Sequence, residues 1–402
     1  MTSRSNGNGG GRWSAALAYV VMISPNAAVG MVLSSMPAAL PLIAVKVGGR
    51  ETAQIIASLA SFGVIAGGIV SGPLLERLQV RRCMLLALSL YAACSLGGVI
   101  WATAVAMSIS RFVLGMAAVF FSSAAVALAT STYSGAARSR ILGLQQAASQ
   151  VANVLCVLSV GALAWWVGWR SAFLVLAGYA ILLMLFVLIS IRGADTLASS
   201  EATNGAIKER LGFNFWRVCS FALLFGVLQM LPMTQLPFLL ADLRAGRWIS
   251  WATGVSYVLA ILGAVSYGRL KLLLGSNNVF LLALVSMTGG AVIMGAAHSP
   301  YMLALASAIV GFGTGVGNTF LFDHGVEVVQ ARQHGKAAGL LFSFVFLGTA
   351  INPLVLFPFE KWLGQHHSLL GVAFVGTALG VFGLMLRVPR RSAGGVLKVK
   401  SP

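Results

Sequence analysis

The chain has 402 residues, of which 58% are hydrophobic and only 9% are charged. A soluble protein of this size carries about a quarter of its residues as charge, so the composition excludes a water-exposed globular protein, and the mean hydropathy of +0.90 indicates a chain solvated by lipid. The net charge of +18 would suggest nucleic acid as a partner of a soluble protein. We expect no such partner here, because the Lys and Arg residues lie in short groups between long apolar runs.

The N-terminal segment 1–12 is rich in Gly, Ser and Asn and has no apolar core, so we expect a cytoplasmic tail rather than a signal peptide. The cysteines are Cys83, Cys94, Cys156 and Cys219, which form no C-x-x-C pair. Metal sites and disulfide frameworks need convergent spacing. We therefore expect neither a metal nor a cofactor.

A helix that crosses a membrane needs about twenty apolar residues. The stretches without Asp, Glu, Lys or Arg are 13–45, 52–75, 83–110, 112–137, 141–169, 171–191, 218–241, 248–268, 272–322, 337–359 and 362–386. The 272–322 stretch is too long for one helix, and His298-Ser299-Pro300 predicts a turn inside it. The 83–137 region is interrupted only by Arg111, and the break between its two helices is expected near Trp101 to Thr103 instead. The predicted number of membrane helices is therefore twelve.

A polar stretch, Arg192 to Arg217, separates the sixth predicted helix from the seventh and is typical of a mobile linker. We therefore predict an all-α membrane protein with a tail at 1–12, a six-helix bundle at 13–191, a cytoplasmic linker at 192–217, a second six-helix bundle at 218–387 and a tail at 388–402. We expect the protein to be a monomer.

The Lys and Arg residues predict the orientation. With both termini cytoplasmic, the tails and the loops on their side hold twenty of these residues and the opposite side holds six, while Arg111 lies within a helix. An excess of Lys and Arg marks cytoplasmic loops. We therefore expect a multi-pass protein of a cell membrane, the bacterial inner membrane, with both termini in the cytoplasm.

One register aligns the two halves. An offset of 196 residues pairs Gly30 with Gly226, Pro41 with Pro237, Gly67 with Gly263, Gly72 with Gly268, Gly115 with Gly311, Gly143 with Gly339, Trp166 with Trp362, and Gly168 with Gly364. Parallel halves related by an axis along the membrane normal are a transporter architecture, with the substrate bound between them near the midplane.

Three motifs stand at matching helix numbers. The loop after the second helix reads GPLLERLQVRR (72–82), the fourth helix carries RFVLG (111–115), and the turn after the fifth reads GWRSAF (168–173). They are similar to the G-x-L-a-D-r-x-G-r-k, R-F-x-x-G and G-W-R-x-x-F patterns of the major facilitator superfamily, with Glu76 and Gln79 as departures. The resemblance implies a non-enzymatic secondary transporter that moves a small molecule through the lipid bilayer by alternating access.

Gating residues are expected at the cytoplasmic end. Gly63, Gly68 and Gly72 predict a small-residue ridge along the second helix. Glu76 forms a charge latch with Arg77 and Arg81, or is one acid in an ordinary basic loop. At the end of the tenth helix, Asp323 stands with His324 and Glu327, and we interpret this group as a gate.

Cavity residues are expected on the fifth helix, where Gln146, Ser149, Gln150 and Asn153 share one face by their i, i+3, i+4, i+7 spacing. Polar groups inside a membrane face the bundle interior, so these contact substrate or form interhelical hydrogen bonds. Further candidates are Asn26, Gln229, Gln235, Thr314, Asn318 and Asn352.

Arg111 lies about six residues deep in its helix, on the order of 9 Å at 1.5 Å per residue. No carboxylate lies inside the helices of the first half. The guanidinium either faces the central cavity and favours neutral or anionic cargo, or it is a structural group bound by backbone carbonyls.

All nine carboxylates fall at predicted helix ends or in loops. Protons are the candidate coupling ion, and Asp323 is the nearest candidate to carry them, against a gating role. No P-loop is present, so energy must come from a gradient or from downhill flow. Helix 5 has Gly161 but lacks the proline of the drug–proton antiporter motif. From the family resemblance we expect efflux of a small organic molecule. The alternatives are an importer or facilitator of a neutral or anionic metabolite, and a membrane-embedded enzyme or sensor.

Overall fold

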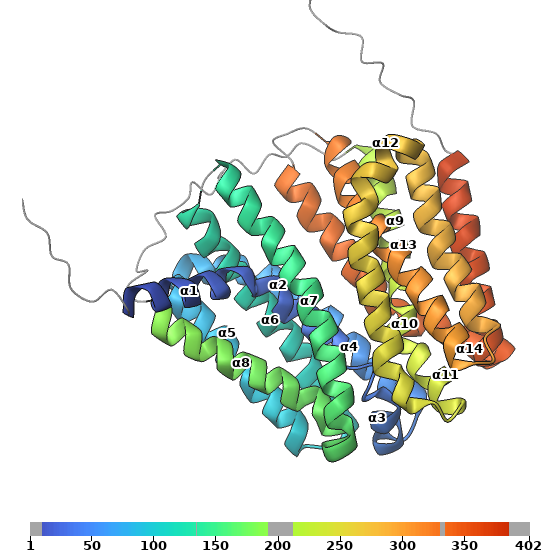
Figure 1. Ribbon diagram of the computed structural model, residues 1–402, viewed down its shortest axis with the longest axis horizontal. Helices are drawn as coiled ribbons and strands as arrows, with labels where there is room; N and C mark the ends of the chain where they lie inside the picture. The colour runs from blue at the N-terminus through green and yellow to red at the C-terminus, as the bar shows by residue number, and fades with distance from the viewer. Residues whose placement is uncertain (1–9, 134, 192–211, 330–333, 386–402) are drawn as a thin grey trace, which may run out of the picture.

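The computed structural model describes residues 10–133, 135–191, 212–329 and 334–385, and these are almost entirely helical (Figure 1). The first half contains α1 (Gly10–Ile23), α2 (Pro25–Ser34), α3 (Leu40–Val47), α4 (Arg50–Arg77), α5 (Val80–Ile100), α6 (Ala104–Thr132), α7 (Gly135–Val167) and α8 (Ser171–Ser190). The second contains α9 (Phe213–Gln229), α10 (Leu231–Thr234), α11 (Leu236–Asp242), α12 (Ile249–Gly295), α13 (Pro300–Glu327) and α14 (His334–Met385).

Eight helical runs in the described part of the chain are long and apolar enough to cross a membrane, or nine if the bent pair Ala16–Ile23 and Pro25–Ser34 is one span. Two of the runs, of 44 and 50 residues, are about twice the length that one crossing needs. They break at Gly168 and Gly275, and α14 breaks at Gly364, where φ is positive. With these breaks the chain has the twelve predicted spans.

The predicted breaks at Trp101–Thr103 and at His298–Pro300 are confirmed. Helix α5 ends at Ile100, and the Thr103 side chain caps α6 by accepting a hydrogen bond from the Ala106 N–H. The predicted tails at 1–12 and 388–402 and the linker at 192–217 lie wholly or largely outside the described residues.

Spans 1 and 7 are discontinuous, which the sequence analysis did not predict. Span 1 consists of α1, α2 and α3, with a bend of 51° between α1 and α2; span 7 consists of α9, α10 and α11. The breaks follow from proline, which has no N–H to donate and whose ring clashes with a carbonyl of the preceding turn. Pro25, Pro41, Pro232 and Pro237 all occupy the first turn of their short helices.

The 196-residue repeat is confirmed by the packing of its glycines. A Cβ on Gly115 would lie 2.1 Å from the Ala60 carbonyl oxygen, and one on Gly311 would lie 2.1 Å from the Ser256 carbonyl oxygen. Residues 60 and 256 are themselves 196 apart. Each half therefore brings its second and fourth spans into backbone contact in the same way.

The predicted glycine ridge on the second span is wrong in one position. Gly63 faces the Phe112 carbonyl and Gly67 faces Met116, whereas Gly68 meets nothing within 4 Å. The close contact uses positions four apart on one helical face. Gly72 is in α4, but its surroundings lie outside the described side chains.

We predict that Gly115→Val destabilises the protein, because its Cβ would overlap backbone atoms of α4 that cannot rotate away. Overpacking of this kind costs about 1–3 kcal/mol. The matched control is Gly68→Val, where the added side chain enters open space. Thermal unfolding of the purified protein should show a lower midpoint for Gly115→Val only; equal midpoints for the two variants would contradict the close approach of α4 and α6.

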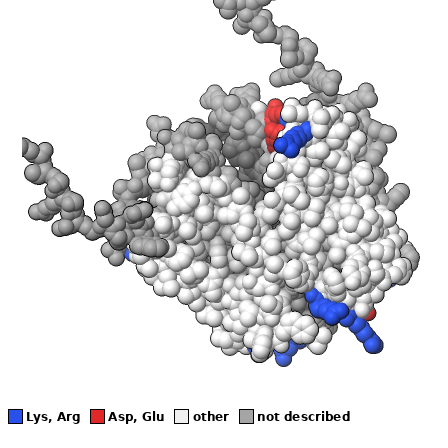
Figure 2. Space-filling model, in the orientation of Figure 1, with Lys and Arg blue, Asp and Glu red and all other residues white. Residues whose placement is uncertain are grey.

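The two halves form separate groups of helices, α1–α8 and α9–α14, that meet at one end (Figure 1). On the face drawn in Figure 2, Lys, Arg, Asp and Glu lie at two opposite ends with a wide uncharged belt between them. An uncharged belt between charged ends is what a lipid bilayer requires of a spanning protein.

Candidate functional site

The discontinuous span 1 lies at the centre of a hydrogen-bond network. Side chains of neighbouring helices donate to backbone carbonyls of span 1. The donors are Tyr91 to Ala28, Gln145 to Met22, Ser149 to Asn26, Tyr179 to Ser24, and Arg111 to Val32. Spans 3, 4, 5 and 6 all hold span 1 in this way.

Arg111 is fully buried, and its guanidinium lies against the break between α2 and α3. A continued helix would pair the Val32 carbonyl with the Met36 N–H, but Met36 donates to Leu33 instead. Arg111 Nη2 and the Ser35 hydroxyl donate to the Val32 carbonyl, and Nη1 donates to Ser35 Oγ at 3.4 Å. Of the two roles considered from the sequence, the contacts are those of a carbonyl-bound arginine.

The polar face of α7 packs against α2. Ser149 donates to the Asn26 carbonyl at 3.0 Å, and Asn153 lies 3.5 Å from the Ser34 hydroxyl and 3.4 Å from Gln150. Asn153 also fills the space over Gly30, where a Cβ would lie 2.3 Å from its amide oxygen. The Gln146 side chain is not among those described. The contacts of Ser149 with Asn26 and of Asn153 with Ser34 are interhelical hydrogen bonds, as one of the two interpretations predicted, whereas that of Asn153 with Gln150 lies within α7.

Asn26 connects span 1 to span 4 through its side chain, which accepts a hydrogen bond from Ser122 at 3.3 Å. In the second half, Asn318 of span 10 donates to Gln229 of span 7 at 3.0 Å. Both pairs join the broken span of a half to the fourth span of the same half. Asn26, Gln150, Gln229 and Asn318 are each partly exposed, so they remain accessible to a bound molecule.

The other polar candidates of the second half lie deeper. Thr234 donates to the Asn352 amide oxygen at 3.0 Å, and Asn352 donates to the Val227 carbonyl at 2.8 Å. The Thr234 hydroxyl, the Asn352 amide and the Val227 carbonyl lie around the break between α9 and α10. Gln235 is buried and donates to Glu360 at 2.6 Å. Asn352 and Gln235 therefore stabilise the break of span 7, as Arg111 does for span 1.

The two halves meet at one end of the molecule, which we call the outer end: the end with the connections 48–49, 101–103 and 243–248. Arg50 of α4 forms an ion pair with Asp242 of α11, and Gln54 donates to the Thr234 carbonyl at 3.3 Å. A Cβ on Gly161 of α7 would lie 1.8 Å from the Ser250 hydroxyl oxygen of α12. These contacts close the outer end.

The opposite or inner end carries the connections 78–79 and 274–276. The segments α3 and α11, one from each half, lie beside each other at the lower end of the view in Figure 1, which is the outer end. The polar contacts of spans 1 and 5 and of spans 7 and 10 each lie within one half.

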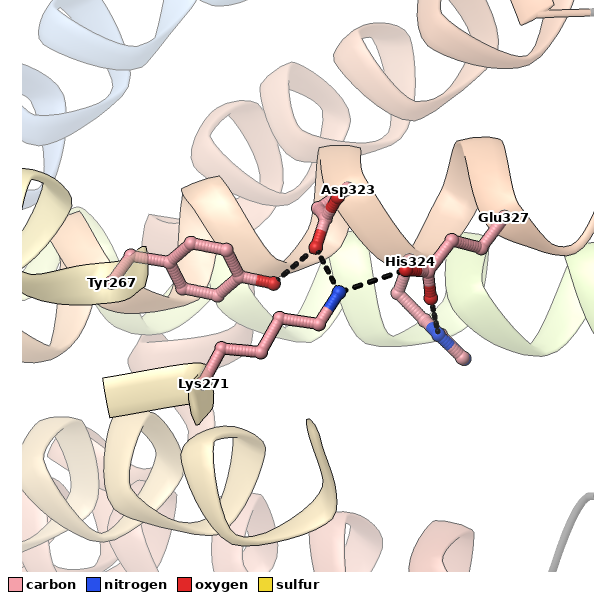
Figure 3. Close-up of polar contacts among 5 residues, drawn as sticks. All are labelled: Tyr267, Lys271, Asp323, His324 and Glu327. Atoms are coloured by element: carbon pink, nitrogen blue, oxygen red, sulfur yellow. Dashed lines mark hydrogen bonds and ion pairs between the residues drawn. The ribbon is translucent and has the colours of Figure 1, made fainter. Parts of the chain in front are cut away.

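A charged cluster at the inner end joins spans 8 and 10 (Figure 3). Lys271 donates to Asp323 at 2.6 Å and to Glu327 at 2.8 Å, Tyr267 donates to the same Asp323 oxygen, and His324 lies 3.4 Å from Glu327. One oxygen of the Asp323 carboxylate accepts from both Tyr267 and Lys271, and both donors belong to the same half. This geometry suits a structural clamp at the helix ends better than a freely titrating proton carrier.

The latch predicted in the first half falls on side chains that are not described, namely those of Glu76 and Arg77. Arg81 is half-buried, and its Nε atom is buried without a partner among the described residues. The observed cluster around Lys271 occupies the corresponding end of the second half.

Sequence reasoning missed several members of the network, above all Gln145, Gln54, Tyr91, Tyr179 and Glu360. Gln145 precedes Gln146 and lies on the face of α7 that contacts span 1, together with Ser149 and Asn153 at i+4 and i+8. That spacing could have identified Gln145 from the sequence. Tyr91 and Tyr179 could not be identified in this way, because a tyrosine in an apolar span is as often a packing residue as a hydrogen-bond donor.

The chain resembles known proteins along its length. The profile of the family described as Major Facilitator Superfamily matches residues 22–353. An uncharacterised MFS-type transporter of Mycobacterium tuberculosis is 34% identical over 153 residues, covering 37% of this chain and 22% of the relative. The MFS-type efflux transporter ffsH of Aspergillus flavipes is 30% identical over 167 residues, covering 40% of this chain and 26% of the relative. The chain thus spans well under half the length of these relatives.

Two solved structures share the fold. The nucleoside transporter NupG superposes with a TM-score of 0.76 at 14% identity, covering 92% of this chain and 100% of that one. A POT family transporter in complex with 5-aminolevulinic acid gives a TM-score of 0.74 at 12% identity, covering 94% and 96%. Identities this low establish a common fold and nothing about cargo.

Proposed function

The chain belongs to the Major Facilitator Superfamily, whose profile matches residues 22–353, and we propose from this premise that it is a secondary transporter that exports a small organic molecule by alternating access. The observation that carries the proposal is the pair of discontinuous spans 1 and 7, one in each of two halves that Arg50–Asp242 and Gly161–Ser250 join at the outer end. Discontinuous spans at the interface between repeats form substrate sites in transporters.

The site proposed for the cargo lies between spans 1, 5, 7 and 10. Its partly exposed amides (Asn26, Gln150, Gln229 and Asn318) offer hydrogen-bond donors and acceptors without a carboxylate. Buried Arg111 adds positive charge close by. This combination favours a neutral or anionic polar molecule over a lipophilic cation. Efflux as the direction is supported by the names of relatives from Aspergillus flavipes and Pyricularia grisea, both MFS-type efflux transporters.

We also propose that the inner end faces the cytoplasm, with both termini on that side. Arg82 is exposed at the start of α5, which makes it a suitable labelling position. In a cysteine-free background, Arg82→Cys in intact cells should react only with a membrane-permeant reagent. Reaction with an impermeant reagent would reverse the orientation.

The function is tested in two steps. A thermal-shift screen of purified protein against metabolites and antibiotics finds ligands, since binding to the native state raises its apparent stability. Each ligand is then measured in proteoliposomes of defined orientation, with and without a pH gradient. Accumulation of the ligand against its concentration gradient supports secondary active export. Equilibration of the ligand without accumulation would indicate a facilitator. Absence of movement for every bound ligand would favour a sensor.

A further inference from the structure

Glu360 lies within α14 rather than in the loop that the charge pattern predicted, and its partly buried carboxylate accepts a hydrogen bond from Gln235 at 2.6 Å. We propose that Glu360 binds a proton from the outer side and that its protonation stabilises the closed outer end. This proposal rests on the proposed function of secondary transport.

The first argument is an unsatisfied acceptor. The Gln235 side chain is fully buried and donates through its amide nitrogen to Glu360. Its amide oxygen is buried without a partner among the described residues. A carboxylic acid beside a primary amide can form a pair of bonds, accepting from the N–H and donating its O–H to the amide oxygen. A carboxylate has no proton to donate, so only protonated Glu360 satisfies both groups of Gln235.

Exchanging the nitrogen and oxygen of the Gln235 amide leads to the same result. The amide oxygen would then face the Glu360 carboxyl oxygen at the same short separation, and two acceptors at that distance require a proton between them. In the first orientation the bond from the Gln235 N–H by itself stabilises the carboxylate, and only the unmet need of the amide oxygen favours the acid; in the second orientation the contact requires the neutral form of Glu360.

The second argument is the charge around the group. Glu360 shares a hollow of about 750 Å³ at the outer end with Arg50, Glu51, Gln54 and Lys361. Arg50 forms its ion pair with Asp242 and lies over the Phe238 ring. The hollow thus presents two cations, Arg50 and Lys361, and one other carboxylate, Glu51, and gives protons a route to Glu360 from the outer side.

The third argument is the connection to the contacts between the halves. Gln235 stands at the break between α10 and α11, directly after Thr234. The Thr234 carbonyl accepts the hydrogen bond of Gln54 from the other half, and Asp242 at the end of α11 holds Arg50. A change in the Glu360–Gln235 pair therefore acts on the segment that closes the outer end. Deprotonation leaves the Gln235 oxygen facing a carboxylate and favours opening.

The proton is bound from the outer side and released to it, so it sets the conformation of the outer end without crossing the membrane. A proton that enters from the outer side when that end is open would favour its closure and return the empty transporter to the state described. Cargo would then bind from the inner end. The reaction is a single proton transfer from water to the Glu360 carboxylate, with no other bond made or broken.

The test needs no cargo. Spin labels at Val105 and Leu305, exposed residues near the outer end of spans 4 and 10, report the separation of the halves in nanodiscs as a function of pH. In the wild type the short distance should become more populated as the pH falls. Glu360→Gln, which mimics the neutral carboxyl, should keep the short distance at every pH, whereas the control Glu51→Gln should retain the wild-type pH dependence.

A pH dependence that survives in Glu360→Gln, or its absence in the wild type, would overturn the proposal while leaving transport itself untouched. Should Glu360→Gln fail to fold, infrared spectroscopy of the wild type decides. The band of a protonated buried carboxyl must appear with the same midpoint as the distance change, and a distance change without that band would equally refute the assignment.

Discussion

Replacing Arg111 by Gln should lower transport by about 10- to 100-fold while the protein still folds. Arg111 supplies donors to the Val32 carbonyl and to Ser35 at the break between α2 and α3. A hydrogen bond from a charged group is worth about 1.5–3 kcal/mol, and each 1.36 kcal/mol is a factor of ten in rate. Loss of these hydrogen bonds changes the backbone geometry of span 1, which lines the proposed site.

The Arg111→Gln variant should still fold, because burying the positive charge of Arg111 is itself unfavourable in free energy. An arginine at the membrane centre costs about 2.5–3.5 kcal/mol on insertion scales, and among the described residues Arg111 has no ion-pair partner. Removing the charge gains free energy, and this gain offsets much of the stability that is lost with the hydrogen bonds of Arg111. Arg111→Lys should also transport poorly, because one ammonium group does not reproduce the two nitrogens of the planar fork that reach separate acceptors.

The matched control is Arg82→Gln, which removes a positive charge from an exposed position at the inner end. It should leave transport close to that of the wild type. Uptake into proteoliposomes, together with the thermal unfolding midpoint, separates the outcomes. Wild-type transport by Arg111→Gln would show that neither the charge nor the anchoring of span 1 matters for cargo.

Replacing Gly161 by Val should hold the outer end open. Any Cβ at this position would lie 1.8 Å from the Ser250 hydroxyl oxygen and 2.6 Å from its Cβ. The hydroxyl can rotate away but the Cβ cannot, so α7 and α12 must separate. The label pair at 105 and 305 should then report a population of longer distances, and net transport should fall because the closed state is less accessible.

Two variants control this result. Gly178→Val adds the same side chain to α8, where a Cβ meets nothing within 4 Å, and should leave the distances unchanged. Ser250→Gly in the Gly161→Val background removes the clashing atoms and should restore part of the short-distance population. Unchanged distances in Gly161→Val would mean that this contact does not determine closure.

The twelve spans could be predicted because they depend on composition alone, through lipid solvation of long uncharged stretches. The repeat could also be predicted, since backbone contacts at Gly115 and Gly311 demand glycine at both positions. The discontinuity of spans 1 and 7 was less accessible. Prolines such as Pro25 and Pro232 are common within membrane helices, and whether one breaks a helix depends on partners for the freed carbonyls.

The site was predicted only in part. Asn26, Asn153 and Asn318 do make interhelical hydrogen bonds, but which group each side chain reaches depends on helix rotation, which the sequence does not encode locally. Glu360 was misplaced for a definite reason. The spans were predicted as stretches without charged residues, so every acidic residue was assigned to a loop or a helix end. This rule cannot identify a carboxyl group that lies inside a helix and accepts a hydrogen bond from a buried amide.

The central claim is that the two ends open alternately, and paired distances test it most directly. One label pair spans the outer end at Val105 and Leu305, and a second spans the inner end at Arg82 and Leu272, all exposed. Both pairs are measured by electron paramagnetic resonance over the same series of pH values and bound ligands. Alternating access predicts that every condition that shortens the outer distance lengthens the inner one. Outer and inner distances that vary independently, or that never change, would contradict it.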